Sequence, residues 1–465
     1  MSVFYGAVIN PESLTTYRAL PRCLLLIGPD GTIDWMIEDV KEHLLQDTLA
    51  QKGLINADVT FLQDGEFLIP GFIDTHTHAP QFLNLGSGQQ YELLDWLQNV
   101  TFPAEAKFAD LELARCSYHT VVKNIISFGT TTCCYYGTLH LEATKILADI
   151  VHSYGQRAFV GKCNMNRNSP DDYIEHSTQS SVDATRELIT YIRSLSCSAP
   201  EPLVKPILTP RFAISCTDDL LEELGKMASS DPHLHIQTHI SENHGEVKYT
   251  KELFPKAPHY AGVYDMFGLL RYNTVLAHGV LLEDEEIDLI AKRRAGISHC
   301  PVSNFNLRSG IAPIGKYLDC GVKVGLGTDV SGGFSPSILT VVQHASVASK
   351  VMAFQSNEGP KEGKFTNRQL PVATLFYLAT LGGAEVCDID KQVGSFAPGK
   401  SFDALLVNVK DKMGNPGIWG ADVSHLTDGK LNPSNLLELL LERFLFCGDD
   451  RNIMRVYVQG KVIGG

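Results

Sequence analysis

Residues 70–78 read Pro-Gly-Phe-Ile-Asp-Thr-His-Thr-His, a short apolar run that ends in two histidines one residue apart. Side chains alternate between the two faces of a β-strand, so His76 and His78 point the same way, as two ligands of one metal ion must. The pair is a weak signal alone, because the chain has 16 histidines and His233 and His235 repeat the spacing. Its meaning depends on whether further ligands follow at the ends of other strands.

The alternation of segments from residue 67 onward predicts the fold. Apolar, strand-like runs alternate there with amphipathic stretches, which is typical of βα units and a parallel sheet. Strands are predicted over residues 67–76, 129–136, 157–163, 203–212, 234–239, 274–278, 296–300 and 322–329. Helices are predicted between them over residues 111–126, 183–195, 218–228, with Thr217 as the N-cap, and 283–294. Eight such units over roughly 320 residues favour an α/β fold, a (β/α)8 TIM-type barrel, over an open doubly wound sheet.

Both ends of the chain have the character of β-structure. Residues 1–66 consist of short apolar runs and turns, and strands are predicted again over residues 402–409 and 454–463. We expect the two ends to form a small β-sandwich domain from residues 1–66 and 386–465, beside a barrel of residues 67–385.

The composition excludes several classes of protein. A formal net charge of −14 argues against a nucleic-acid partner and against an anionic membrane surface, because both favour clusters of Lys and Arg. The N-terminal residues lack the features of a secretory signal, and no window approaches the length of a membrane span. The 11 cysteines include no Cys-x-x-Cys, which suits reduced thiols in a cytoplasmic protein. The same absence excludes the zinc deaminases with a Pro-Cys-x-x-Cys signature.

Further residues of metal-ligand type stand at the ends of later predicted strands. The fifth strand ends at His239, the sixth at His278 and the eighth at Asp329. In a barrel these ends converge on one mouth, and with His76 and His78 they bring together three or four imidazoles and a carboxylate. Three histidines and a carboxylate with an open coordination position form a Lewis-acid site that activates water. Glu242, just after the fifth strand, is the natural second acid–base group, with a solvated loop charge as the alternative.

Other histidines lack this placement. His235 lies toward the opposite end of the predicted barrel, so His233 and His235 are interpreted as structural. His299 lies close enough to the mouth to contact the ligands.

Together these stretches resemble the amidohydrolase superfamily, in its mononuclear deaminase branch. The motifs that carry the resemblance are residues 70–78, His-Ile-Ser-Glu at 239–242, Ala-His-Gly at 277–279, His-Cys-Pro-Val-Ser-Asn at 299–304 and Gly-Thr-Asp at 327–329. Dinuclear members carry a carboxylated lysine at the end of the fourth strand. Here residues 209–212 read Thr-Pro-Arg-Phe and Lys205 lies at the beginning of that strand, so the resemblance implies one metal ion per subunit.

Within this branch the chain is most similar to the guanine deaminase family. The similarity runs through residues 94–97, 101–105, 129–132, 155–162, 209–212 and 448–452. It implies a homodimer that deaminates guanine hydrolytically to xanthine and ammonia. Metal-activated water attacks C2, Asp329 acts as the base, and Glu242 carries a proton to the adjacent ring nitrogen.

The resemblance also implies a role for each site residue. The metal is zinc, with Fe2+ as the alternative, and its ligands are His76, His78, His239 and Asp329. The catalytic residues are Glu242, Asp329 and His278. The residues at the substrate are His78, Ala79, Pro80, Gln81, Arg211, Phe212, His239, Glu242, His278 and Asp329. Pro80 has no N–H to donate to a ligand.

Two other functions stay open at this point. The first is a deaminase or chlorohydrolase of the same branch that acts on cytosine, an adenosine derivative or a triazine, which would differ at the ring-contact positions. The second is a non-catalytic protein on this barrel, which would lack stoichiometric metal.

Overall fold

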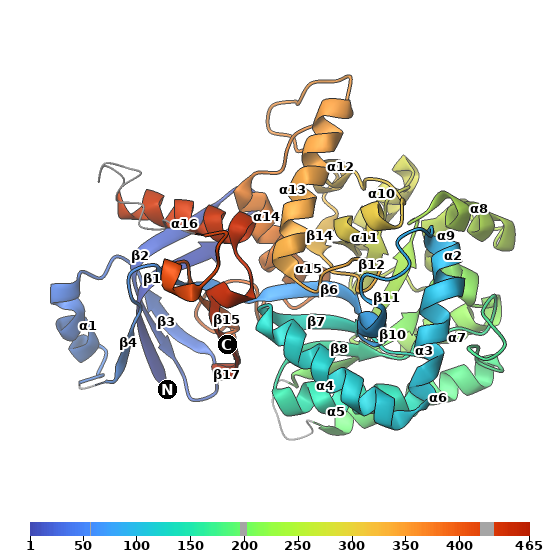
Figure 1. Ribbon diagram of the computed structural model, residues 1–465, viewed down its shortest axis with the longest axis horizontal. Coiled ribbons are helices and arrows are strands. Elements are labelled where there is room, and N and C mark those ends of the chain that lie inside the picture. The colour runs from blue at the N-terminus through green and yellow to red at the C-terminus, as the bar shows by residue number, and fades with distance from the viewer. Residues whose placement is uncertain (56, 196–201, 419–431) are drawn as a thin grey trace.

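Eight parallel strands form the centre of the structure, and helices surround them (Figure 1). The computed structural model describes residues 1–55, 57–195, 202–418 and 432–465. The central strands are β6 (Phe72–His78), β7 (Thr130–Tyr136), β8 (Arg157–Gly161), β10 (Val204–Pro210), β11 (His235–Ile240), β12 (Thr274–His278), β13 (Gly296–His299) and β14 (Lys323–Leu326). They pair in this order, and the two-residue strand β9 (Cys163–Asn164) adds to β10. This confirms the predicted (β/α)8 barrel.

The ring of strands closes where the chain leaves β14 and meets β6. The Asp329 N–H donates a hydrogen bond to the carbonyl oxygen of His76 (2.8 Å), and the His78 N–H donates to the carbonyl oxygen of Val330 (3.2 Å). Because these bonds hold the last strand against the first, two histidines and an aspartate meet at one point of the mouth.

Helices cover the outside of the barrel. They are α4 (Leu111–Ser127), α5 (Leu141–Tyr154), α6 (Thr178–Leu195), α7 (Asp218–Ser230), α8 (His244–Leu253), α9 (Tyr260–Met266), α10 (Asp284–Arg293), α11 (Pro301–Asn306), α12 (Ile314–Asp319), α13 (Ile338–Gln355), α14 (Val372–Ala379) and α15 (Leu381–Val386). The four predicted helices correspond to α4, α6, α7 and α10. The Thr217 hydroxyl accepts a hydrogen bond from the Leu220 N–H (3.4 Å), so the predicted N-cap of α7 is confirmed. Among the described helices, none combines the length and the apolar character needed to cross a bilayer.

Both ends of the chain meet in a second sheet beside the barrel (Figure 1). Its strands are β1 (Ser2–Pro11), β2 (Tyr17–Ile27), β3 (Ile33–Ile37), β4 (Val59–Phe61), β5 (Glu66–Pro70), β15 (Ala404–Asn408), β16 (Ile453–Val458) and β17 (Lys461–Gly464). They form one hydrogen-bonded sheet in the order β17-β16-β15-β5-β1-β2-β3, with β4 paired to β1. Two helices accompany it, α1 (Leu45–Gln51) and α16 (Pro433–Cys447). The two chain ends therefore build one β-sheet unit, which confirms that they come together; its strands form one continuous sheet.

The prediction of one strand over residues 67–76 is wrong, because this stretch contains two strands. β5 pairs with β1 and β15 in the terminal sheet, whereas β6 pairs with β7 in the barrel. Gly71 separates them, and a Cβ atom at this position would lie 2.1 Å from Thr131 Oγ1. Only glycine allows this close approach at the crossover. The barrel therefore begins at Phe72 and not at residue 67.

A long connection after β6 forms a roof over the mouth of the barrel. It contains the 3-10 helix η2 (Ala79–Asn84), α2 (Leu93–Trp96), the π-helical turn η3 (Leu97–Thr101), α3 (Phe102–Ala106) and the 3-10 turn η4 (Lys107–Ala109). Trp96 and Phe102 of the roof are buried in an apolar cluster with Tyr136 and Phe212 of the barrel. Burial of this apolar surface stabilises the roof and keeps water from the polar groups beneath it.

Candidate active site

Four polar side chains converge at the mouth of the barrel. His76 and His78 lie on β6, His239 lies on β11 and Asp329 follows β14. The Nε2 atoms of His76 and His78 lie 3.1 and 3.6 Å from Asp329 Oδ1. His78 Nε2 lies 3.1 Å from His239 Nε2. The ligand atoms of a tetrahedral zinc ion, each about 2.1 Å from the metal, stand roughly 3.4 Å apart. The spacing of the four groups therefore fits one metal ion.

The protonation states of these groups also suit a metal ion. Burial lowers the pKa of His76, and it lowers the pKa values of His78 and His239 well below their ordinary value, which favours the neutral form of imidazole that binds a metal ion. The His239 Nδ1–H donates to the carbonyl oxygen of Arg211 (2.6 Å), which leaves the lone pair on Nε2 facing the other ligands. Burial acts to raise the pKa of Asp329, but the hydrogen bond with His76 and the nearby imidazoles outweigh it and lower that pKa.

A second carboxyl group borders the same point. Glu242 Oε2 lies 3.3 Å from His278 Nε2, which lies 3.7 Å from Asp329 Oδ2, and these three residues could also hold a metal ion. The His278 ring is oriented by its Nδ1–H, which donates to Asn304 Oδ1 (2.9 Å). Burial, together with the charges of Asp329 and Glu246, raises the pKa of Glu242 well above its ordinary value. Because metal ligands must be deprotonated, the set with three histidines is the stronger candidate for the metal, and Glu242 is suited to donate a proton.

The backbone at this point is strained. Ser241, His278 and Asp329 have positive φ angles of 48°, 75° and 45°. Side-chain-bearing residues adopt this region rarely and at a cost, and such residues gather at functional sites. The strain sets the direction in which the side chains of His278 and Asp329 leave their strand ends.

A pocket opens between these groups and the roof. It encloses about 360 Å³, with solvent at its opening included. Its walls are formed by His78, Gln81, Leu93, Trp96, Leu97, Arg211, Phe212, His239, Glu242, Leu307 and Asp329. Apolar walls with a few converging polar groups are typical of a binding site for a small molecule.

Comparison with known proteins identifies the family. The sequence profile of the amidohydrolase family matches residues 67–463. The chain belongs to the amidohydrolase family. The guanine deaminase of Dictyostelium discoideum is 40% identical over 468 residues, which cover 100% of this chain and 98% of the relative. The guanine deaminase of Homo sapiens is 37% identical over 99% of this chain and 96% of its own. A crystal structure of guanine deaminase from C. acetobutylicum with guanine bound in the active site has 34% identity and a TM-score of 0.85, and the match covers 99% of both chains.

The pocket of this amidohydrolase brings most of the predicted site residues together. Seven of them line it: His78, Gln81, Arg211, Phe212, His239, Glu242 and Asp329. His76 and His278 lie against Asp329. Ala79 and Pro80 are buried in η2 and are not among the residues that line the pocket.

Sequence reasoning missed Glu105, a buried carboxylate beside two of these residues. Glu105 accepts hydrogen bonds from Arg211 Nη1 (2.6 Å), Arg211 Nη2 (3.1 Å) and Gln81 Nε2 (2.8 Å). It also missed the apolar walls formed by Leu93, Trp96, Leu97 and Leu307. Two signals for Glu105 were present in the sequence: it is the single acidic residue of the stretch 101–105, and this stretch is one of those that carry the family resemblance.

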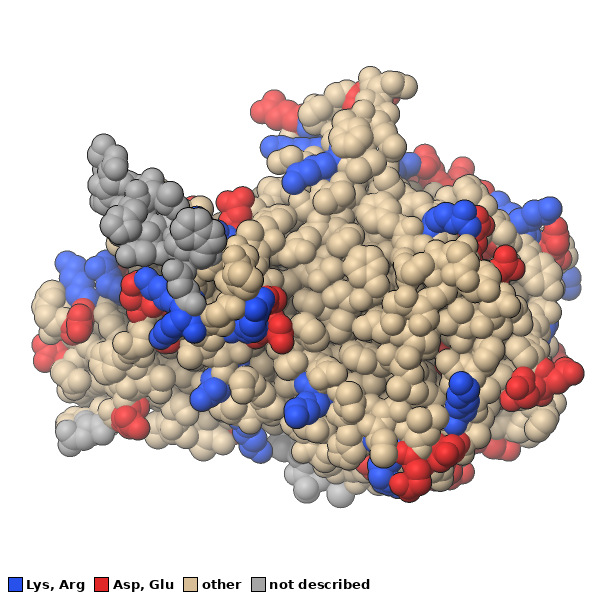
Figure 2. All heavy atoms as spheres, viewed as in Figure 1, with Lys and Arg blue, Asp and Glu red and all other residues tan. Residues whose placement is uncertain are grey.

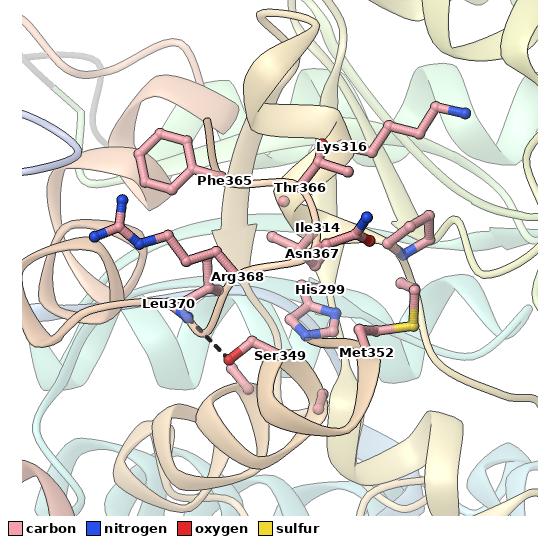
Figure 3. Close-up of a pocket in the computed structure, with 15 residues that line it drawn as sticks. His299, Ile314, Lys316, Ser349, Met352, Phe365, Thr366, Asn367, Arg368 and Leu370 are labelled. Atoms are coloured by element: carbon pink, nitrogen blue, oxygen red, sulfur yellow. Dashed lines mark hydrogen bonds between the residues drawn. The ribbon is translucent and has the colours of Figure 1, made fainter. Parts of the chain in front are cut away.

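A second cavity, of about 570 Å³, lies between α12, α13 and residues 365–370 (Figure 3). His299 forms part of its wall together with apolar side chains such as Ile314, Met352 and Phe365. Burial, with His278 nearby, lowers the pKa of His299 to about 3, so its ring is neutral. None of the predicted metal ligands or substrate contacts lines this cavity. The pocket beneath the roof is therefore the candidate active site.

Proposed function

We propose that this amidohydrolase is a guanine deaminase, which hydrolyses guanine to xanthine and ammonia. One observation carries the proposal: a single pocket combines a set of metal ligands, a buried carboxyl group that can carry a proton, and two side chains that offer N–H groups. The two guanine deaminases from Dictyostelium discoideum and Homo sapiens match the chain over almost its whole length, which supports the same reaction here.

The metal is inferred to be zinc, with Fe2+ as the alternative, because both accept imidazole and carboxylate ligands. His76, His78, His239 and Asp329 would hold it. A bound zinc ion supplies Lewis acidity, which lowers the pKa of a water molecule toward neutrality.

The chain's own carboxyl groups then move the protons. Deamination exchanges the amino group on C2 for the oxygen of water. The water gives up both of its protons: one replaces the proton that Glu242 gives to the ring nitrogen next to C2, and one passes by way of Asp329 to the amino group, which leaves as ammonia. Asp329, which its lowered pKa keeps deprotonated, is the group that accepts a proton from water. Glu242, with its raised pKa, donates a proton to the ring nitrogen next to C2 and makes that carbon more electrophilic. The His278 ring lies next to both carboxyl groups, with its Nε2 atom 3.3 Å from Glu242 Oε2 and 3.7 Å from Asp329 Oδ2.

The purine ring is held by Gln81 and Arg211, with Phe212 beside it. These side chains line the pocket and are almost completely buried, with exposed fractions of 1%, 2% and 6%. A ring that leaves a buried donor unpaired loses about 1–3 kcal/mol for each one. Substrate choice therefore depends on the match between these donors and the edge of the ring.

An assay of ammonia release tests the proposal. The purified protein, with its metal content measured, is incubated with guanine, adenine, cytosine and a pterin in turn. We expect efficient release from guanine and a kcat/KM lower by orders of magnitude for the others. Efficient turnover of another ring with negligible turnover of guanine would instead assign the protein to a different activity of the same branch. Absence of both bound metal and turnover would favour a non-catalytic role.

We also propose that the protein is a cytoplasmic homodimer. The cytoplasmic assignment is supported by the ten described cysteines, which are all free thiols; Cys197 lies outside the described residues. The homodimer is supported by the resemblance to the guanine deaminase family. It is also supported by a wide area of surface near the centre of Figure 2, in which no Lys, Arg, Asp or Glu is seen. Val347 and Phe354 of α13 are also exposed, at 51% and 74%. Sedimentation analysis would test the assembly, and a monomer at micromolar concentration would contradict it.

A further inference from the structure

Glu105 lies at the centre of a buried hydrogen-bond network behind the substrate pocket. It belongs to α3 in the roof, and its exposed fraction is 0%. Its Oε2 atom accepts hydrogen bonds from Arg211 Nη1 (2.6 Å) and from the Tyr173 hydroxyl (2.6 Å). Its Oε1 atom accepts from Arg211 Nη2 (3.1 Å) and from Gln81 Nε2 (2.8 Å). One carboxylate thus contacts both of the side chains proposed to hold the ring.

A carboxylate can only accept hydrogen bonds, so it determines which way the amide of Gln81 turns. The amide must present its NH2 group to Glu105. Its Oε1 atom accepts from the backbone N–H of Ser331 (3.0 Å). The oxygen of the Gln81 amide is therefore already hydrogen-bonded within the protein. The group left to face the pocket is the second N–H of its NH2, which is a donor.

The same carboxylate controls Arg211. The paired contacts at 2.6 and 3.1 Å hold the guanidinium plane in one orientation, and a guanidinium has five N–H donors and no acceptor. Burial acts to lower the pKa of Arg211, but Glu105 outweighs it and raises that pKa, so the side chain stays charged in a dry environment. With Glu105 in place, both Gln81 and Arg211 offer only N–H groups to the ring.

We propose that Glu105 is a positioning residue that makes this wall of the pocket donor-only and so selects 6-oxopurines over 6-aminopurines. Guanine presents two acceptors side by side, O6 and N7, which match adjacent donors. A 6-amino group places a donor where O6 would be, and two donors then face each other without an acceptor. This inference rests on the proposed function, because it concerns the same pocket and the same reaction at C2.

Two substrates with the same amino group at C2 test the inference: guanine has an oxygen at C6 and a proton on N1, whereas 2,6-diaminopurine has an amino group at C6 and no proton on N1. The comparison measures kcat and KM for formation of the product deaminated at C2, which chromatography separates from the guanine that loss of the 6-amino group would give. We expect the wild-type protein to prefer guanine by more than about 100-fold in kcat/KM, because sites built to hydrogen-bond a group reject analogues that lack it. In Glu105→Gln the new amide carries donors of its own, so Gln81 can turn its oxygen toward the pocket. We expect the preference to fall at least about tenfold, mainly through a higher KM for guanine.

Two further variants separate this role from general loosening of the fold. Glu105→Asp keeps an acceptor-only group but withdraws it by one methylene, so it should retain more of the preference than Glu105→Gln. It also serves as the test if Glu105→Gln does not fold. Glu286→Gln is the matched control, because Glu286 is also buried and accepts backbone hydrogen bonds from Ala261 and Glu283, both at 2.8 Å, away from the pocket. It should leave the preference unchanged.

The outcomes distinguish the two proposals. A wild-type protein that does not turn over guanine overturns the proposed function. Guanine turnover with the same preference in wild type, Glu105→Gln and Glu105→Asp overturns only the role of Glu105. Equal losses for both substrates would also overturn it, because they indicate a structural effect without a change in hydrogen-bond polarity.

Discussion

Replacement of Glu242 by glutamine tests the proposed proton transfer most directly. The amide has almost the same shape as the protonated carboxyl group, and its oxygen can still accept from the Ser309 hydroxyl, which lies 3.5 Å from Glu242 Oε1. It has no proton of suitable pKa to give to the ring. Because the pKa of Glu242 is raised, the substitution exchanges one neutral group for another and leaves no buried charge unpaired.

The expected magnitudes follow from this geometry. General acid–base catalysis by one side chain contributes about 10²–10⁴-fold to a rate, which corresponds to about 3–5 kcal/mol in the activation barrier. We therefore expect kcat of Glu242→Gln to fall by about 10³-fold, with a much smaller change in KM. The free energy of unfolding should change by less than about 1 kcal/mol, because the contacts of the side chain are nearly conserved.

Three measurements on the same sample decide the outcome. Ammonia release gives kcat and KM, elemental analysis gives the metal content, and urea denaturation gives the free energy of unfolding. Glu286→Gln, a buried glutamate substituted outside the pocket, serves as the control for handling and folding. Near-normal turnover by a metal-loaded Glu242→Gln protein would remove Glu242 from the proton path. Loss of the metal together with activity would instead favour the alternative ligand set of Glu242, His278 and Asp329.

Three other perturbations test different parts of the molecule. Dialysis against a chelator should abolish ammonia release and lower Tm, and added zinc should restore both; activity that survives complete metal removal would contradict a metal-dependent reaction. Arg211→Lys loses the paired contacts with Glu105, so kcat/KM for guanine should fall by about 10–100-fold; an unchanged value would show that the fork geometry is dispensable. Burial lowers the pKa of His235 from 6.5 to about 4. As pH falls between these two values, the unfolded chain binds a proton at His235 and the folded protein does not, so the free energy of unfolding decreases. The free energy of unfolding of wild type should therefore drop by about 3 kcal/mol more than that of His235→Gln between pH 7 and pH 4, and parallel pH profiles from urea denaturation would refute this.

The barrel could be predicted because its signals are local. Each central strand is a short apolar run. Helix α7 begins directly after its N-cap Thr217, and its buried residues recur at helical spacing. The metal ligands could be predicted for a related reason, since residues at the C-terminal ends of barrel strands must meet at the mouth. The same argument predicts that His235 is structural, because it stands at the beginning of β11 and so lies away from the mouth. Its Nε2–H donates to the carbonyl oxygen of Cys387 (3.1 Å).

What could not be predicted depends on contacts between distant segments. The break between β5 and β6 was missed because both are apolar, and only pairing with β15, more than 300 residues later, assigns β5 to the terminal sheet. Glu105 was missed because an acidic residue on a short helix is usually solvated. Its burial follows from the folding of the roof over the barrel, which brings it to Arg211 at a separation of 106 residues.

The residues proposed for catalysis and those proposed for substrate preference lie on different parts of the fold. The metal ligands and Glu242 stand on or directly after barrel strands, where pairing with neighbouring strands leaves little freedom. Gln81 and Glu105 stand on the roof, which is a connection between β6 and α4 and can change in sequence without disturbing the strands. Arg211 directly follows a strand but takes its orientation from the roof through Glu105. Substitutions in the roof should therefore change which ring is accepted while metal binding and the water-activating groups persist, whereas substitutions at the strand ends should abolish turnover of every ring alike.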